Sequence, residues 1–109
     1  MGKSRDLAGL EFITQSASVS AATATATTLF TLPANDFATY LVTAGVIAND
    51  PGNYHEVAII SQQGTTLLVN VLVNAALCNI TVSGLNIQGT QSSGITANIA
   101  GRLTCLARE

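Results

Sequence analysis

His55 is the single histidine of this 109-residue chain, so it is the first candidate for acid–base chemistry. Glu56 follows it directly, and Asp50 precedes the pair. Adjacent side chains of an extended strand point to opposite faces, which makes His55 and Glu56 poor partners for each other. A serine-type site needs a nucleophile, a base and an orienting group within hydrogen-bond reach, and Ser61 lies in no strand-to-helix turn that would present it. We therefore predict that the chain is not an enzyme.

Carboxylates and metal ligands are equally sparse. A glycosidase needs two carboxylates about 5–10 Å apart. Asp50 and Glu56 supply two carboxylates, but only their number fits this requirement. Both flank a predicted turn, where acidic residues are common. Asn49, Asp50 and Asn53 would offer calcium only one carboxylate, which makes a weak site. We expect neither a metal ion nor a cofactor.

The two cysteines, Cys78 and Cys105, fall at inward-facing positions of predicted strands. Cysteine behaves as a small hydrophobic residue in such places. The N-terminal segment has no apolar stretch of the kind found in signal peptides, so nothing indicates an oxidising compartment. We expect two free thiols, with pairing as the alternative if the two strands adjoin.

The chain is short of charge. It is 48% hydrophobic and only 9% charged, whereas an ordinary soluble domain is about 25% charged. Its net charge of −2 and four scattered cations do not form the basic stripe of a nucleic-acid-binding protein. No apolar run approaches the roughly 20 residues of a transmembrane helix. The cations lie near the two ends, and we expect Arg102 and Arg108 only to be solvated.

This shortage of charge has a consequence for assembly. A monomer of this composition would expose a large apolar and threonine-rich surface, which soluble monomers rarely do. A closed homo-oligomer removes such surface from water, because its interface resembles a core cut in half. We expect an oligomer, with a monomer solvated by Thr, Ser and Asn as the alternative.

The sequence divides into an arm with a Ser/Thr/Ala-rich lead, residues 1–28, and a β-domain, residues 29–109. Residues 1–14 combine charges with apolar side chains at helical spacing, which fits an arm that becomes ordered on a partner. A frayed terminus is the alternative. Residues 22–27 alternate alanine with threonine, so an extended chain there would have an alanine face and a threonine face. A flexible linker is the other interpretation of this lead.

Past the lead the pattern is all-β. Short runs with period-two alternation are separated by turn residues, which favours a β-sandwich or jelly roll of about seven or eight antiparallel strands. Leu67, Val69, Val71 and Val73 form one uniformly apolar side of a run, and we expect this side to face the core. The expected strands cover residues 29–32, 39–48, 56–61, 65–73, 77–83, 85–88, 95–100 and 103–107.

Glycine and polar clusters mark the turns between these runs. Residues 49–53, Asn-Asp-Pro-Gly-Asn, form the strongest turn signal. Gly64 and Gly84 predict hairpin turns. Residues 91–94, Gln-Ser-Ser-Gly, predict a polar hairpin loop, and Gly101 is expected to break a strand.

Two stretches carry a pattern of known kind. The first is SASVSAATATATTLFTLPANDFATYLVTAGV, residues 16–46, in which a Ser/Thr/Ala-rich lead precedes the strand opening at Leu29–Pro33. The second is ITVSGLNIQGTQSSGITANIAGRLTCLAR, residues 80–108, with the loop Thr90–Gly94 and a closing strand that carries arginine. Together they resemble the C-terminal modules of bacteriophage virion fibre and knob proteins, especially those of marine phages. The resemblance covers most of the chain.

This resemblance implies a homotrimeric β module that is a structural part of a virion, made in the host cytoplasm and without catalytic activity. The module would be a knob or short tail fibre, or else a protein that decorates the capsid; the sequence leaves these two open. In either place it would dock to other virion proteins through its N-terminal arm. The expected attachment residues are Lys3, Arg5, Leu7, Leu10 and Phe12.

Contact with a host surface glycan is expected in two loops, because loops carry function on such scaffolds. The alternative function is a carbohydrate-binding, lectin-like β-sandwich domain, although the chain has no tryptophan for stacking on a sugar. A small hydrolase is the weakest alternative, and neither nucleic-acid binding nor membrane insertion is expected. The expected recognition residues are Asn49, Asp50, Asn53, Tyr54, His55, Gln91, Ser92 and Ser93.

Overall fold

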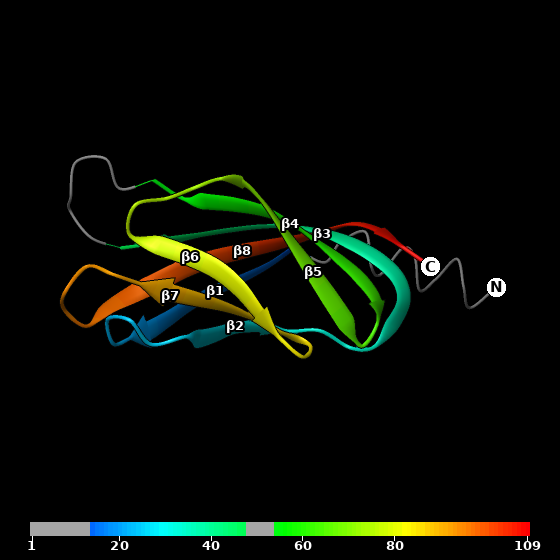
Figure 1. Cartoon of the computed structure of the whole chain (residues 1–109), viewed down its shortest axis with the longest axis horizontal. Helices are drawn as coiled ribbons and strands as arrows, with labels where there is room; N and C mark the ends of the chain where they lie inside the picture. The colour runs from blue at the N-terminus through cyan, green and yellow to red at the C-terminus, as the bar shows by residue number, and fades with distance from the viewer. Residues whose placement is uncertain (1–13, 48–53) are drawn as a thin grey trace.

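The structure is a computed structural model that describes residues 14–47 and 54–109. These residues form eight β-strands in two antiparallel sheets (Figure 1). The larger sheet has the strand order β1-β8-β3-β4-β5, and the smaller sheet has the order β2-β7-β6. The predicted all-β sandwich of seven or eight antiparallel strands is confirmed. The strands are β1 (Thr14–Ala21), β2 (Thr27–Thr31), β3 (Asn35–Val46), β4 (Glu56–Gly64), β5 (Thr66–Val73), β6 (Cys78–Ser83), β7 (Asn86–Gln91) and β8 (Ala97–Arg108).

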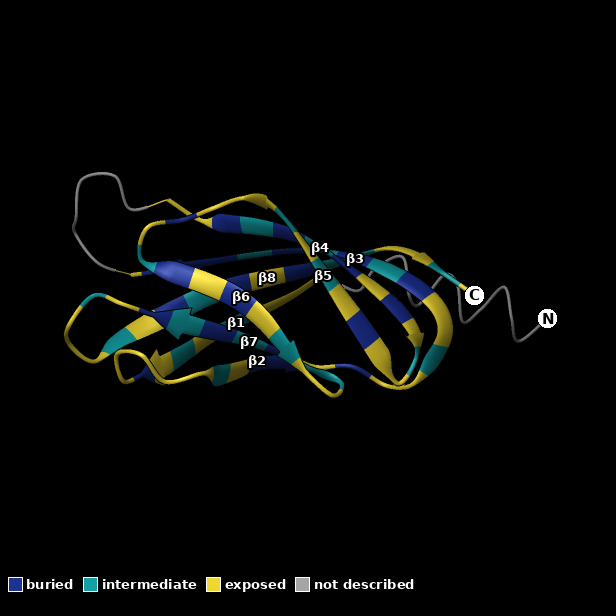
Figure 2. Ribbon diagram, in the orientation of Figure 1, coloured by how far each residue is buried: buried dark blue, intermediate teal, exposed yellow. Residues whose placement is uncertain are grey.

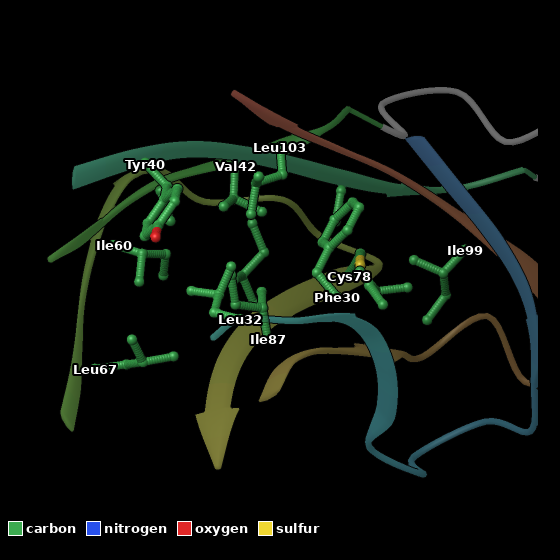
Figure 3. Close-up of a cluster of buried hydrophobic side chains, with 14 of the residues drawn as sticks. Phe30, Leu32, Tyr40, Val42, Ile60, Leu67, Cys78, Ile87, Ile99 and Leu103 are labelled. Carbon is green, nitrogen blue, oxygen red and sulfur yellow. The ribbon is translucent and has the colours of Figure 1, made fainter. Parts of the chain in front are cut away.

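The core lies between the two sheets, and every second residue of most strands contributes to it (Figures 2 and 3). This alternation is the period-two pattern of the sequence. Ile60 from β4, together with Ile99 and Leu103 from β8, belongs to the same buried cluster as Ile87 from β7. Burial of each such side chain stabilises the fold by about 1.5–3 kcal/mol. No helix in the described ranges has the length and apolar character needed to cross a membrane.

The prediction that one side of β5 faces the core is confirmed at Leu67, which is buried, and at Val69 and Val71, which are partly buried against the core. The prediction is wrong at Val73, which is 49% exposed. The register of β4 and β5 shifts between Val57 and the next residue, and Val73 pairs with Val57. An irregularity in the ladder changes the face to which the following residues point, which is the reason for the difference.

Residues 14–21 form β1, although the sequence analysis assigned residues 1–28 to an arm and lead. β1 pairs with β8 along its whole length. Its serines are exposed, whereas Ala17 and Val19 pack against the core and Ala21 is buried. The alternating alanine and threonine residues that follow contain a turn, in which Ala24 adopts a left-handed φ of 61°. The sandwich therefore begins with a strand of small side chains.

The prediction that Gly101 breaks a strand is wrong, because β8 continues through it. Gly101 pairs with Ala17 of β1 and with Ala44 of β3, and it is buried. A Cβ atom at this position would lie 3.2 Å from Leu29 Cδ1 and 3.3 Å from Phe30 Cε2. Glycine is therefore present because the β2 side chains of the opposite sheet approach the β8 backbone closely.

The hairpin turns predicted at Gly64 and Gly84 are confirmed, with φ values of 65° and 58°. The hairpin predicted at residues 91–94 is wrong. β7 pairs with β2 and β6, whereas β8 pairs with β1 and β3, so residues 92–96 cross from the smaller sheet to the larger one. Ile95 in this crossing is 67% exposed, although it alternates with the buried Ile99.

Four connections between strands pass from one sheet to the other, and we call them crossings. Buried polar side chains hold them in place through hydrogen bonds. Glu56 is 1% exposed, and its carboxylate accepts hydrogen bonds from the backbone N–H groups of Ala75 at 3.0 Å and Ile80 at 2.7 Å. Ala75 lies in the β5–β6 crossing, and β6 is an edge strand. The carboxylate therefore supplies an acceptor that the edge of the sheet would otherwise lack.

Gln62 fastens the β2–β3 crossing in the same manner. Its side-chain amide donates to the carbonyl oxygens of Pro33 at 2.7 Å and Gly64 at 3.0 Å. Its amide oxygen accepts a hydrogen bond of 2.8 Å from the Tyr40 hydroxyl. All the polar groups of this buried side chain are therefore used, as burial requires.

Gln91 joins the remaining two crossings. Its side-chain amide donates to the carbonyl oxygens of Ala21 at 2.9 Å and Ile95 at 2.6 Å. Its backbone carbonyl accepts a hydrogen bond of 2.8 Å from the N–H of Ala24. One residue at the end of β7 therefore holds both the β1–β2 and the β7–β8 crossing.

Candidate functional site

The predicted attachment residues Lys3, Arg5, Leu7, Leu10 and Phe12 lie outside the described residues, and so do Asn49, Asp50 and Asn53 of the first predicted recognition loop. The structure describes the other end of that loop. Tyr54 is 67% exposed, and His55 is exposed beside it. Both side chains are therefore available at the surface, where the sequence analysis placed them.

The second predicted recognition loop uses its polar side chains internally. Gln91 is fully buried and cannot contact a ligand in solution. Its amide oxygen accepts hydrogen bonds from the Ser93 N–H at 2.7 Å and the Ser93 hydroxyl at 2.6 Å. The Ser92 hydroxyl donates to the Ala76 carbonyl at 3.3 Å. Gln91 was therefore predicted in the wrong role, because its position at a sheet crossing demands an internal hydrogen-bonding side chain.

His55 and Glu56 point to opposite sides of the larger sheet, as predicted. Glu56 is inside the sandwich, whereas a Cβ atom on Gly45 would lie 3.0 Å from His55 Cδ2. The imidazole therefore lies over the backbone of β3, on the side of the sheet that faces away from the core. Gly45, which lacks a side chain, makes room for the ring.

The face of the larger sheet that points away from the smaller sheet, here called the outer face, has a polar half over β1 and β8. The register places Arg102 of β8 between Ser16 of β1 and Thr43 of β3. In the next row of the outer face, Ala100 lies between Ser18 and Gly45. These small side chains leave a hollow of about 330 Å³, bordered by Arg102, Ser16, Thr43 and His55.

The other half of the outer face is rich in apolar side chains, although Ser61 of β4 and Asn70 of β5 lie there beside Leu68 and Ile59. It carries Leu41 of β3, Val57 and Ile59 of β4, and Leu68 and Val73 of β5, and we call this set the apolar strip. Leu68 is 68% exposed and Val73 is 49% exposed, while the other three are half-buried. The single charged residue of β4 and β5 is Glu56, which points into the core. The strip is therefore free of charge.

A second hollow, of about 190 Å³, lies at the end of the sandwich and is bordered by Tyr40, Cys105 and Arg108. Burial raises the pKa of the Tyr40 hydroxyl, and the Cys105 thiolate adds to this, whereas Arg108 acts in the opposite direction. Burial also raises the pKa of the Cys105 thiol, again against the effect of Arg108. In the described ranges, no group of three or more His, Cys, Asp or Glu side chains is placed to hold a metal ion.

Cys78 and Cys105 are both free thiols, as predicted. Burial and the nearby Glu56 carboxylate raise the pKa of Cys78 to about 11. At pH 8 we expect iodoacetamide to label the half-buried Cys105 at least tenfold faster than Cys78, because the thiolate is the reactive form. Peptide mass spectrometry measures the two rates. Equal rates at pH 8 would contradict the burial of Cys78.

The same pKa shift has a consequence for stability. Because the folded protein holds the Cys78 proton more tightly than the unfolded chain, the contribution is complete below the pKa of the unfolded thiol. It is lost as the pH rises from about 9 towards 11. We expect the urea midpoint of the wild type to fall more steeply over this pH range than that of Cys78→Ala.

Comparison with known proteins bears on the fold. No protein-family model matches this sequence, and no curated protein matches it significantly. The tailspike protein gp49 of Acinetobacter baumannii bacteriophage Fri1, a capsular polysaccharide depolymerase, has a similar fold over part of its chain, with a TM-score of 0.59. The two are 12% identical, and the match covers 83% of this chain but only 16% of the tailspike.

The tailspike protein of Acinetobacter phage vB_ApiP_P1 shows a weaker likeness, with a TM-score of 0.48 and 12% identity. That match covers 87% of this chain and 21% of the tailspike. The part of gp49 that resembles this chain in fold is therefore only a fraction of that tailspike. The likeness to gp49 supports, at the level of the fold, the resemblance to phage virion fibre proteins.

Proposed function

We propose that this chain is a structural, non-enzymatic module of a bacteriophage virion, which assembles as a homotrimer and docks onto other virion proteins. The fold likeness to part of the Fri1 tailspike supports a place in a phage particle. The depolymerase activity of that tailspike is not transferred, because this chain spans only 16% of its length.

The apolar strip carries the assembly part of the proposal. Three strands spaced about 4.8 Å apart and some eight residues long present roughly 400 Å² of sheet, which the apolar strip shares with Ser61 and Asn70. The largest exposed apolar patch of a soluble monomer is about 300–600 Å² and is often functional, which supports an interaction site here. The partner that fits is a second copy of the chain, because an uncharged sheet face finds an equally uncharged and pleated surface there. The low overall charge of the chain also favours self-association.

Docking is assigned to the N-terminal arm. Its predicted attachment residues, Lys3 to Phe12, precede β1, which is an edge strand of the larger sheet. The apolar strip lies on β3, β4 and β5, towards the other edge of this sheet, so attachment and self-assembly are assigned to different parts of the chain. Both attachment to the capsid and attachment to the tail are compatible with this arrangement.

We expect Leu68→Asp to convert the protein from a trimer into a monomer, because the variant places a charge at the most exposed position of the apolar strip. Light scattering should give three times the chain mass of 11.2 kDa for the wild type and one chain mass for the variant. Particles produced with a tagged wild-type chain should be labelled by an antibody to the tag at discrete sites, and the Leu68→Asp chain should be lost from them.

Ile95→Asp is the matched control. Ile95 is 67% exposed, almost as much as Leu68, but it lies in the β7–β8 crossing and not on the apolar strip. This variant should remain a trimer. A wild type that is monomeric at micromolar concentration would contradict the assembly, and unlabelled particles would contradict the place in the virion.

A further inference from the structure

The hollow of the outer face results from the side chains of three neighbouring strands. Ala100 of β8 is flanked by Ser18 of β1 and Gly45 of β3, so these three strands place no side chain larger than serine in that row. One row further along the strands, Arg102 stands between Ser16 and Thr43. Directly opposed side chains on neighbouring strands lie about 5 Å apart. Both hydroxyls are therefore close to the stem of the arginine.

His55 forms the opposite border of the hollow. Its ring lies over Gly45, in the row of Ala100, and it is exposed. The Arg102 guanidinium and the hydroxyls of Ser16 and Thr43 thus lie on one side of the hollow, and the His55 imidazole lies on the other. The Ala100 methyl group forms the floor between them. The volume of about 330 Å³ is near the lower end of the range for small-molecule sites, which is about 300–1,000 Å³.

The polar groups around the hollow are unused within the described part of the chain. Among residues 14–47 and 54–109, the side chains of Arg102, Ser16, Thr43 and His55 form no hydrogen bond or ion pair. None of the described residues that line the hollow is acidic. Arg102 is also the single charged residue that β1 and β8 place on the outer face. Its guanidinium is therefore free to bind an anion from solution.

We propose that this hollow binds one carboxylate-bearing sugar unit. The Arg102 guanidinium pairs with the carboxylate through two parallel hydrogen bonds, the geometry that arginine offers and lysine does not. The hydroxyls of Ser16 and Thr43 and the His55 imidazole bind sugar hydroxyl groups. The Ala100 methyl group packs against the C–H face of the ring. The site lies beside β1, on the other half of the outer face from Leu68, and it does not depend on the proposed assembly.

The test uses the full chain and titrates it by NMR with D-glucuronate, D-glucose and acetate. We expect glucuronate to bind at least tenfold more tightly than either of the other two, because it alone offers both the carboxylate and the ring. Arg102→Gln should weaken glucuronate binding by about tenfold or more, as expected for loss of a charged hydrogen-bond pair. Ala100→Leu keeps all four polar groups but fills the floor, and it should also weaken binding.

Arg108→Gln is the matched control, since it removes the same charge from the C-terminal end of β8, away from the hollow, and should leave glucuronate binding unchanged. Equal binding of acetate and glucuronate would overturn the sugar assignment. If Arg102→Gln and Arg108→Gln weaken glucuronate binding equally, the overall charge of the protein attracts the anion, and the proposed site is overturned. Light scattering of each variant reports the oligomer separately, so failure of this site is distinguishable from failure of the assembly.

Discussion

Replacing Glu56 with alanine is expected to lower the free energy of unfolding by about 3–5 kcal/mol, since each hydrogen bond to a buried charged group contributes about 1.5–3 kcal/mol. The variant would leave the N–H groups of Ala75 and Ile80 inside the protein without an acceptor. It would also create a cavity at a position that is 1% exposed. Urea unfolding followed by circular dichroism measures the loss.

Two further variants sharpen this prediction. Glu56→Gln keeps one carbonyl acceptor but turns an amide donor towards a backbone donor, so it should lose about 1–3 kcal/mol. Gln63→Ala, at an exposed position of the same strand, should change stability by about 0.5 kcal/mol or less. A loss below about 1 kcal/mol in Glu56→Ala would mean that water replaces the carboxylate, and that the crossing is not fastened as described.

Gly101→Val is the second substitution with a large expected effect, a loss of about 2–4 kcal/mol or failure to fold. The position faces the core, and even a Cβ atom would lie 3.2 Å from Leu29 and 3.3 Å from Phe30. Valine adds two more methyl groups in the same space. The two sheets would have to separate locally, which breaks the packing of both β2 side chains against β8.

The neighbouring residue provides the control for Gly101→Val. Ala100→Val adds a branched side chain to the same strand, but on the outer face over an open hollow. Because valine favours strands, this variant should be within about 0.5 kcal/mol of the wild type or slightly more stable. If the two variants lose the same stability, the effect belongs to the strand and not to the contact between the sheets.

The sequence predicted the parts of the fold that depend on local alternation. Residues such as Ile80 and Ile87 alternate with polar neighbours, and their inward direction follows from the period of a strand. Gly64 and Gly84 lie in left-handed turns, where glycine is the residue that the backbone conformation requires. These features are encoded within a few residues of each other.

Features that depend on the opposite sheet were not predictable. Gly101 has the appearance of a strand breaker until Phe30 is known to lie against it. β1 was assigned to a lead because its serines and small apolar side chains show little contrast in hydrophobicity. A Gln-Ser-Ser-Gly loop has the same composition whether it closes a hairpin or crosses between sheets, and pairing partners alone distinguish the two.

The candidate site, too, was predictable only where it depends on residues close together in the sequence. The exposure of Tyr54 and His55 followed from their place beside a turn. The internal role of Gln91 was missed, although Gln91 continues the inward positions Ile87 and Gly89 of its strand, and a polar residue at such a position is a usable signal of a buried hydrogen-bond network. Arg102 was assigned only to solvation, because Ser16 and Thr43 become its neighbours through strand pairing between distant segments.

The position of β8 in the larger sheet has a consequence for how the chain reaches its native state. β8 is the last strand in sequence, yet it lies between β1, the first strand, and β3. Among the described strands, β8 is the single partner of β1 within the sheet, so β1 remains unpaired until β8 is available. Contacts between such distant segments make folding slow. β1 therefore stays an unpaired edge until β8 has been synthesised, and at that stage its open backbone groups can associate with other chains.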